Sequence, residues 1–64
     1  MGVAWIKCSE VVPKDKEYVL VSCEGYFEIA CYDYEFKCWN EHSEYIEINP
    51  THWTYLPKPP LSDK

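Results

Sequence analysis

The stretch from residue 51 to residue 60 constrains this chain most, because a strand pattern changes into a proline pattern within it. β-Branched and aromatic side chains alternate with others as far as Leu56, which is typical of a β-strand. Pro57 ends the strand because proline has no N–H to donate to a neighbouring strand. The prolines that follow favour an extended polyproline II conformation. The sequence therefore predicts a final strand and then an extended proline-rich tail over residues 57–64.

Short strand patterns separated by turn signals fill the rest of the chain. They cover residues 5–8, 17–23, 26–36 with a continuation over 37–40, 45–48 and 51–56. Glu24 and Gly25 stand where a tight hairpin belongs. One turn of helix is expected at 9–12, with Ser9 as a candidate N-cap. We therefore predict a single all-β domain over residues 1–64, an antiparallel meander of four to five strands that forms a curled sheet or a small open barrel.

A chain of 64 residues has little room for a core. Domains of this size bury only about 60% of their extended surface, but large rings offset this shortage, and 17% of these residues are aromatic. The residues expected to hold the fold are Trp5, Trp53, Leu56 and Pro57. The limited core and the open sheet edges also predict a dimer or a small ring, with Tyr32 or Tyr34 at the contact between copies.

The charge of the chain argues against several classes of partner. Eleven acidic residues oppose six lysines, the formal net charge is −5, and the sequence has no arginine. Arginine is the usual reader of base edges and of paired phosphate oxygens, so we expect no nucleic-acid partner. The sequence shows no signal peptide and no long apolar run, which predicts a cytoplasmic protein with no membrane partner.

The four cysteines, Cys8, Cys23, Cys31 and Cys38, lack the C-x-x-C spacing of common zinc and redox sites. In a cytoplasmic protein we expect them to be reduced thiols. A zinc-stabilised fold that combines some of these thiols with His42 or His52 stays an alternative. The primary expectation is that the protein carries no metal and no cofactor.

Several motifs of the chain resemble those of a known family. They are Trp5-Ile6, Glu10 with Pro13, Val19-Leu20-Val21, Ala30 with Tyr32, and the closing Thr51-His52-Trp53-x-x-Leu56-Pro57-x-Pro59-Pro60. The chain thus resembles the short phage and prophage proteins catalogued as domain of unknown function five hundred and fifty-one. The cysteines are not part of that pattern. The resemblance implies a phage-borne accessory protein inside the host cell, and it assigns no catalytic residue.

In the long third strand pattern, Phe27, Ile29 and Cys31 share one face, which we expect to turn toward the core, and the candidate binding residues lie on the other face. Tyr26, Tyr32, Tyr34 and Phe36 form a ladder of rings at period two, and tyrosine is enriched at protein interfaces. The ladder could equally be the second face of a sheet, covered by Trp5, Trp39 or the proline tail. His52 is the remaining candidate, and its competing interpretation is a structural histidine that holds the tail by a hydrogen bond.

Catalysis is not expected from this sequence. No nucleophile motif surrounds the serines, no glycine-rich phosphate loop is present, and a chain this short rarely builds a deep pocket. The leading hypothesis is therefore a non-enzymatic interaction module that binds or blocks a host protein and associates with itself. The alternative is an oligomeric sponge that traps a small nucleotide between subunits, with aromatic rings stacked on its base.

Overall fold

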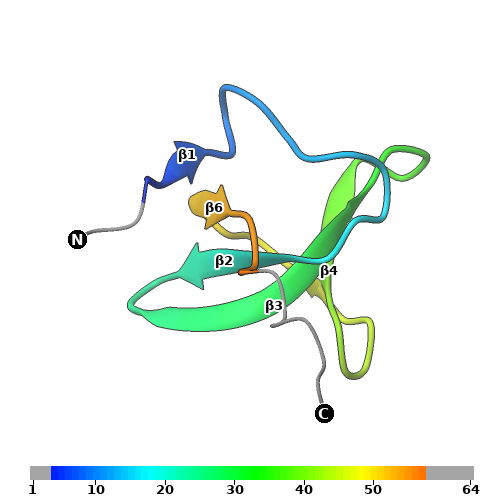
Figure 1. Ribbon diagram of the computed structural model, residues 1–64. Helices are drawn as coiled ribbons and strands as arrows, with labels where there is room; N and C mark the ends of the chain where they lie inside the picture. Colours follow the sequence, from blue (N-terminus) through cyan, green and yellow to red (C-terminus); the bar gives the residue numbers. More distant parts are fainter. Residues whose placement is uncertain (1–3, 58–64) are drawn as a thin grey trace, which may run out of the picture.

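A computed structural model describes residues 4–57 as one antiparallel sheet (Figure 1). Its strands are β1 (Ile6–Lys7), β2 (Val19–Cys23), β3 (Tyr26–Asp33), β4 (Cys38–Glu41), β5 (Glu47–Ile48) and β6 (His52–Thr54). Their order across the sheet is β1-β6-β2-β3-β4-β5. Residues 58–64 lie outside the described part of the chain, and with them lies the predicted proline-rich tail beyond Pro57.

The predicted all-β fold is confirmed, and the details of its topology differ from a simple meander. Strands β2 to β5 do follow one another across the sheet, but β6 returns and lies between β1 and β2. The strand count is six because the predicted strand over 26–36 ends at Asp33. There the side chain of Asp33 accepts hydrogen bonds from the amides of Glu35 and Phe36, at 2.9 and 3.3 Å, and this bends the chain into a turn.

The hairpin between β2 and β3 turns at Glu24 and Gly25, as predicted. Both residues have positive φ angles, 47° and 91°, which is the backbone of the two-residue turn that suits the twist of antiparallel strands. Cys23 and Tyr26 are paired directly before and after it. This register places Val19 opposite Ala30.

The core lies on one face of the sheet and is covered by the segment over residues 8–18, which arches across it in Figure 1. The core cluster consists of Val19, Val21, Cys23, Ala30, Trp39 and Trp53. Trp53 is only 2% exposed, and it is the largest of the fully buried side chains. Its indole Nε1 donates a hydrogen bond of 2.9 Å to the carbonyl oxygen of Val11, so it also fixes the covering segment.

The faces of β3 differ from those that the sequence pattern predicted. The sequence pattern grouped Phe27 with Ile29 and Cys31 as the core-facing set, whereas Ala30 and Tyr32 face the core in the structure. Phe27 is instead 66% exposed. The reason is that both faces of β3 carry apolar side chains, so periodicity alone does not show which face the covering segment occupies.

The predicted helical turn at 9–12 is wrong. The amides of Glu10 and Val11 both donate to the carbonyl oxygen of Lys7, at 3.0 and 3.2 Å, which makes an isolated turn. No helix forms within residues 4–57. Pro13 follows at a buried position, and proline disfavours helical angles in the residue before it.

Candidate binding surfaces

The predicted ladder of rings does not form one surface. Tyr26 and Tyr32 lie on the same face of β3, but at about 3.3 Å per residue they are roughly 20 Å apart along the strand. Tyr34 and Phe36 lie beyond the end of β3, in the turn before β4. Tyr26 is therefore separate from the other three rings, and each ring is described by its own surroundings.

Tyr26 is exposed at the hairpin end of β3. With Cys23 and Asn49 it lines a shallow depression at this end of the sheet. The adjacent Cys23 thiol raises the pKa of the Tyr26 hydroxyl above its ordinary value. We find no second ring stacked on Tyr26 among the described residues.

Tyr32 packs into the edge of the core. Its ring meets Trp39 edge-on at a centroid distance of 5.3 Å and Tyr34 at 5.7 Å. Such edge-to-face pairs stabilise a core beyond the area they bury. Tyr32 is half-buried, and these contacts make it a support for Tyr34 more than a free binding surface.

The turn that carries Tyr34 and Phe36 is held rigidly against the segment over residues 13–17. The Tyr34 hydroxyl donates to the carbonyl oxygen of Pro13 at 2.6 Å, and the Tyr34 amide donates to Asp15 Oδ1 at 3.0 Å. The amide of Lys16 donates to the carbonyl oxygen of Tyr32 at 2.8 Å. Two loops that are distant in sequence are thereby joined into one unit.

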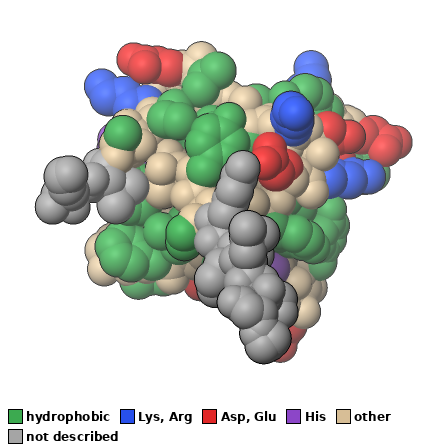
Figure 2. Space-filling model, viewed as in Figure 1, with side chains coloured by type: hydrophobic (Ala, Val, Ile, Leu, Met, Phe, Trp, Pro, Cys, Tyr) green, Lys and Arg blue, Asp and Glu red, His purple; other side chains and the backbone are tan. Residues whose placement is uncertain are grey.

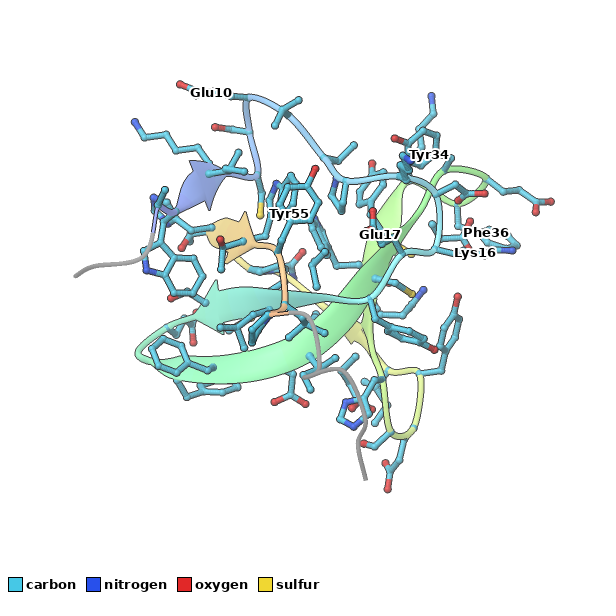
Figure 3. All side chains as sticks on the ribbon, in the orientation of Figure 1. Glu10, Lys16, Glu17, Tyr34, Phe36 and Tyr55 are labelled. Atoms are coloured by element: carbon cyan, nitrogen blue, oxygen red, sulfur yellow. The ribbon has the colours of Figure 1, made fainter. Side chains whose placement is uncertain are left out.

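Phe36 is the most exposed large apolar side chain of the described residues, at 71%. It projects from a turn whose other side is fixed by Asp33, which is only 3% exposed and accepts the amides of Glu35 and Phe36. Figure 3 shows Phe36 and Tyr34 at the same end of the molecule, next to Lys16. We call this unit, made by Asp15, Lys16, Asp33, Tyr34 and Phe36, the Phe36 corner.

Charged groups surround the Phe36 corner. Figure 2 shows lysine and acidic side chains beside one another at the upper right, where Figure 3 labels Lys16 and Phe36. Nearby Glu17 is half-buried, and its Oε1 is shielded from solvent without a hydrogen-bond partner among the described residues. An unpaired buried carboxylate oxygen costs free energy until a donor reaches it.

A second candidate site is a hollow of about 190 Å³ on the face opposite the core. Its lining residues are Trp5, Ser22, Phe27 and His52, and we call it the Trp5 hollow. Trp5 and Phe27 stack with a centroid distance of 5.7 Å and an interplanar angle of 25°. Trp5 thus partly covers the second face of the sheet, which was one role the sequence allowed for it.

His52 faces the Trp5 hollow from the middle of the sheet. It pairs with Lys7 of β1 and Ser22 of β2. Its Nδ1 lies 2.9 Å from the hydroxyl oxygen of Thr51, so the described hydrogen bond of this ring is local. The predicted bond from His52 to the proline tail falls on residues outside the described range.

The remaining structural candidates lie at the end of β6. Leu56 is half-buried and Pro57 is exposed.

Sequence reasoning missed Phe27 as a surface ring because it was grouped with the core set. The available signal was Ser22 on the paired position of β2, since a small polar residue opposite Phe27 leaves that face unfilled.

All four cysteines are free thiols in this structure. Burial, together with the smaller effect of the neighbouring Cys23, raises the pKa of the Cys8 thiol to about 11. Burial likewise raises the pKa of Cys23. These two thiols therefore stay protonated near neutral pH, which is the unreactive form of cysteine.

Among residues 4–57, no group of three or more histidine, cysteine, aspartate or glutamate side chains lies together in a way that would hold a metal ion. The described residues also include no helix with the length and apolar character needed to cross a membrane.

Glu41 organises the loop between β4 and β5. Its carboxylate accepts hydrogen bonds from the hydroxyl and amide of Ser43, at 2.7 and 2.9 Å, and from the amide of Glu44 at 2.6 Å. These donors, the Ser43 hydroxyl foremost, lower the pKa of Glu41 from 4.5 to about 2. The carboxylate has a structural role here, because its lone pairs are occupied by its own loop.

A comparison with protein-family models finds a match that covers residues 4–61. The matching model is described as a protein of unknown function, DUF551. No curated protein and no solved structure matches the chain. The match extends over most of the sequence, from the first described residue into the proline-rich stretch. The chain therefore belongs to the DUF551 family, the one its motifs resemble.

Proposed function

We propose that this protein is a non-enzymatic interaction module, of a kind carried by phages, that binds a protein of the host cell through the Phe36 corner. The observation that carries the proposal is the exposure of Phe36, at 71%, on a turn that hydrogen bonds hold in place. Binding interfaces concentrate their energy in a few large, well-packed anchors. An anchor that is already rigid loses little conformational entropy on binding.

The surroundings of Phe36 support the same proposal. Its neighbour Tyr34 keeps a fixed position through its bond to Pro13, so the backbone of the turn that carries both rings holds a constant shape. Interfaces typically combine an aromatic centre with a polar rim. Lys16, which is exposed, and the half-buried Glu17 supply such a rim. The expected partner surface is an apolar pocket edged by polar groups.

The test is affinity capture from a lysate of the bacterial host with three forms of the full chain. Wild type and Phe27→Ser should retain the same host protein, whereas Phe36→Ser should lose it. Phe27 is the matched control because it is an equally exposed phenylalanine at the opposite end of β3. Circular dichroism must show that all three forms are folded.

A second measurement places the contact. A photo-crosslinking residue at position 36 should form a covalent adduct with the captured protein, and the same residue at position 27 should not. The proposal is wrong if no host protein is retained, or if Phe36→Ser retains it as well as wild type does.

A further inference from the structure

The Trp5 hollow owes its shape to a small residue between large ones. Across the sheet, Ser22 pairs with Phe27 on β3 and with His52 on β6. The serine side chain is the smallest of the three, so it leaves a depression in the sheet surface between the rings of Phe27 and His52. Trp5, stacked on Phe27, then closes one side. The hollow is therefore a consequence of strand register and side-chain size.

The size of the hollow limits what it accepts. Its volume of about 190 Å³ is below the roughly 300–1,000 Å³ typical of small-molecule pockets, so it fits one or two side chains and not a whole nucleotide. Two of its four lining residues are stacked aromatic rings, and Ser22 and His52 add polar groups. Aromatic-lined shallow grooves with a few polar groups are suited to extended proline-rich segments.

The chain carries such a segment in its own sequence, Leu56-Pro57-Lys58-Pro59-Pro60-Leu61. In the structure, His52 lines the hollow at the start of β6, and the strand ends at Thr54, three residues before Pro57. Proline rings fix φ and favour extended angles in the residue before them, which opposes a tight reversal toward the hollow of the same chain. The hollow of another copy is free of this constraint.

We propose that the Trp5 hollow binds the proline-rich segment, residues 57–61, of a second copy of this chain. Exchange in both directions gives a two-fold dimer in which each copy supplies one hollow and one segment. Two simultaneous contacts reinforce one another, since the second becomes intramolecular once the first has formed. Lys58 also brings positive charge to a partner with a formal net charge of −5.

The experiment compares the mass in solution of four forms of the full chain by light scattering, at about 100 µM, where a micromolar dimer predominates. Wild type and the control Phe36→Ser should each give twice the monomer mass of 7.6 kDa. Phe27→Ser and the double variant Pro59→Ala/Pro60→Ala should each give the monomer mass. Circular dichroism on each form separates loss of binding from loss of folding.

Mixing provides the sharper test. Phe27→Ser keeps an intact segment and the double proline variant keeps an intact hollow, so an equimolar mixture should form a heterodimer through one working contact. Because one contact binds more weakly than two, the mixture is measured at a higher concentration, about 1 mM. A monomeric wild type, a dimeric double proline variant, or a mixture that stays monomeric would each overturn exchange between copies. These outcomes leave the capture experiment unaffected, because that experiment depends on Phe36 and uses Phe27→Ser as its control.

Discussion

Trp53 and Val11 are 42 residues apart in the sequence, and the indole Nε1 of Trp53 donates a 2.9 Å hydrogen bond to the carbonyl oxygen of Val11. This contact joins β6, the last strand in the sequence, to the segment that covers the core. It gives one residue two structural roles, since the ring fills the core while its polar edge fixes the cover.

Trp53→Ala is expected to unfold the protein. Truncation of a large buried ring costs about 3–5 kcal/mol, and a domain of this size has roughly 3–10 kcal/mol of total stability. Thermal unfolding followed by circular dichroism measures the effect. His52→Gln, the substitution next to it on the opposite face, should shift the melting temperature far less. Equal shifts in the two variants would show that Trp53 does not anchor the core.

Asp33→Ala is expected to release the Phe36 corner while the sheet remains folded. The substitution removes the acceptor of the Glu35 and Phe36 amides, and a hydrogen bond to a charged group contributes about 1.5–3 kcal/mol. Amide hydrogen exchange should show faster exchange at positions 35 and 36, with little change at Val21 in β2. Unchanged exchange at the turn would mean that other contacts hold it.

The Glu41 loop is expected to lose stability in acid. The folded-state pKa of about 2 lies below the ordinary 4.5, so this stabilisation is fully present above about pH 4.5 and disappears as the pH falls toward 2. Glu41→Gln should lower the melting temperature at pH 7 and flatten its pH dependence between these limits. Glu47→Gln, at an exposed position, is the control, and it should leave the pH dependence of the melting temperature between these limits unchanged.

The Cys8 thiol is expected to resist alkylation in the folded protein. Its pKa of about 11 leaves almost no thiolate at pH 8, so iodoacetamide should modify it slowly, and faster as the pH rises toward 11. In denaturant all four cysteines should react, as counted by mass spectrometry. Fewer than four modified residues in denatured protein alkylated at lysis would contradict the expectation of reduced thiols.

The sequence was sufficient for the elements whose signals are local. The hairpin at Gly25 follows from the backbone freedom of glycine, and the burial of Trp53 follows from an aromatic residue within a strand pattern. The position of β6 between β1 and β2 was not predictable in this way. It depends on pairing between distant segments, which no local pattern encodes.

The candidate sites likewise combine features that have a local sequence signal with features that depend on contacts between distant segments. Phe36 was identified from the sequence as a binding candidate, but its exposure depends on the Asp33 turn that ends β3 early. Phe27 was assigned to the wrong face because β3 is apolar on both sides. Which side is covered depends on the path of residues 8–18, and long-range bonds such as the one between Trp53 and Val11 hold that path in place.

The insertion of β6 between β1 and β2 has a consequence for the order of folding. Until His52–Thr54 has been synthesised, β1 has no neighbour to pair with, and one edge of β2 is unpaired. The hairpin of β2 and β3 can form early because its contacts are local. The six-stranded sheet is complete only when β6 has paired with β1 and β2. β6 therefore completes the sheet, and a chain that stops short of Trp53 exposes the β2 edge to aggregation.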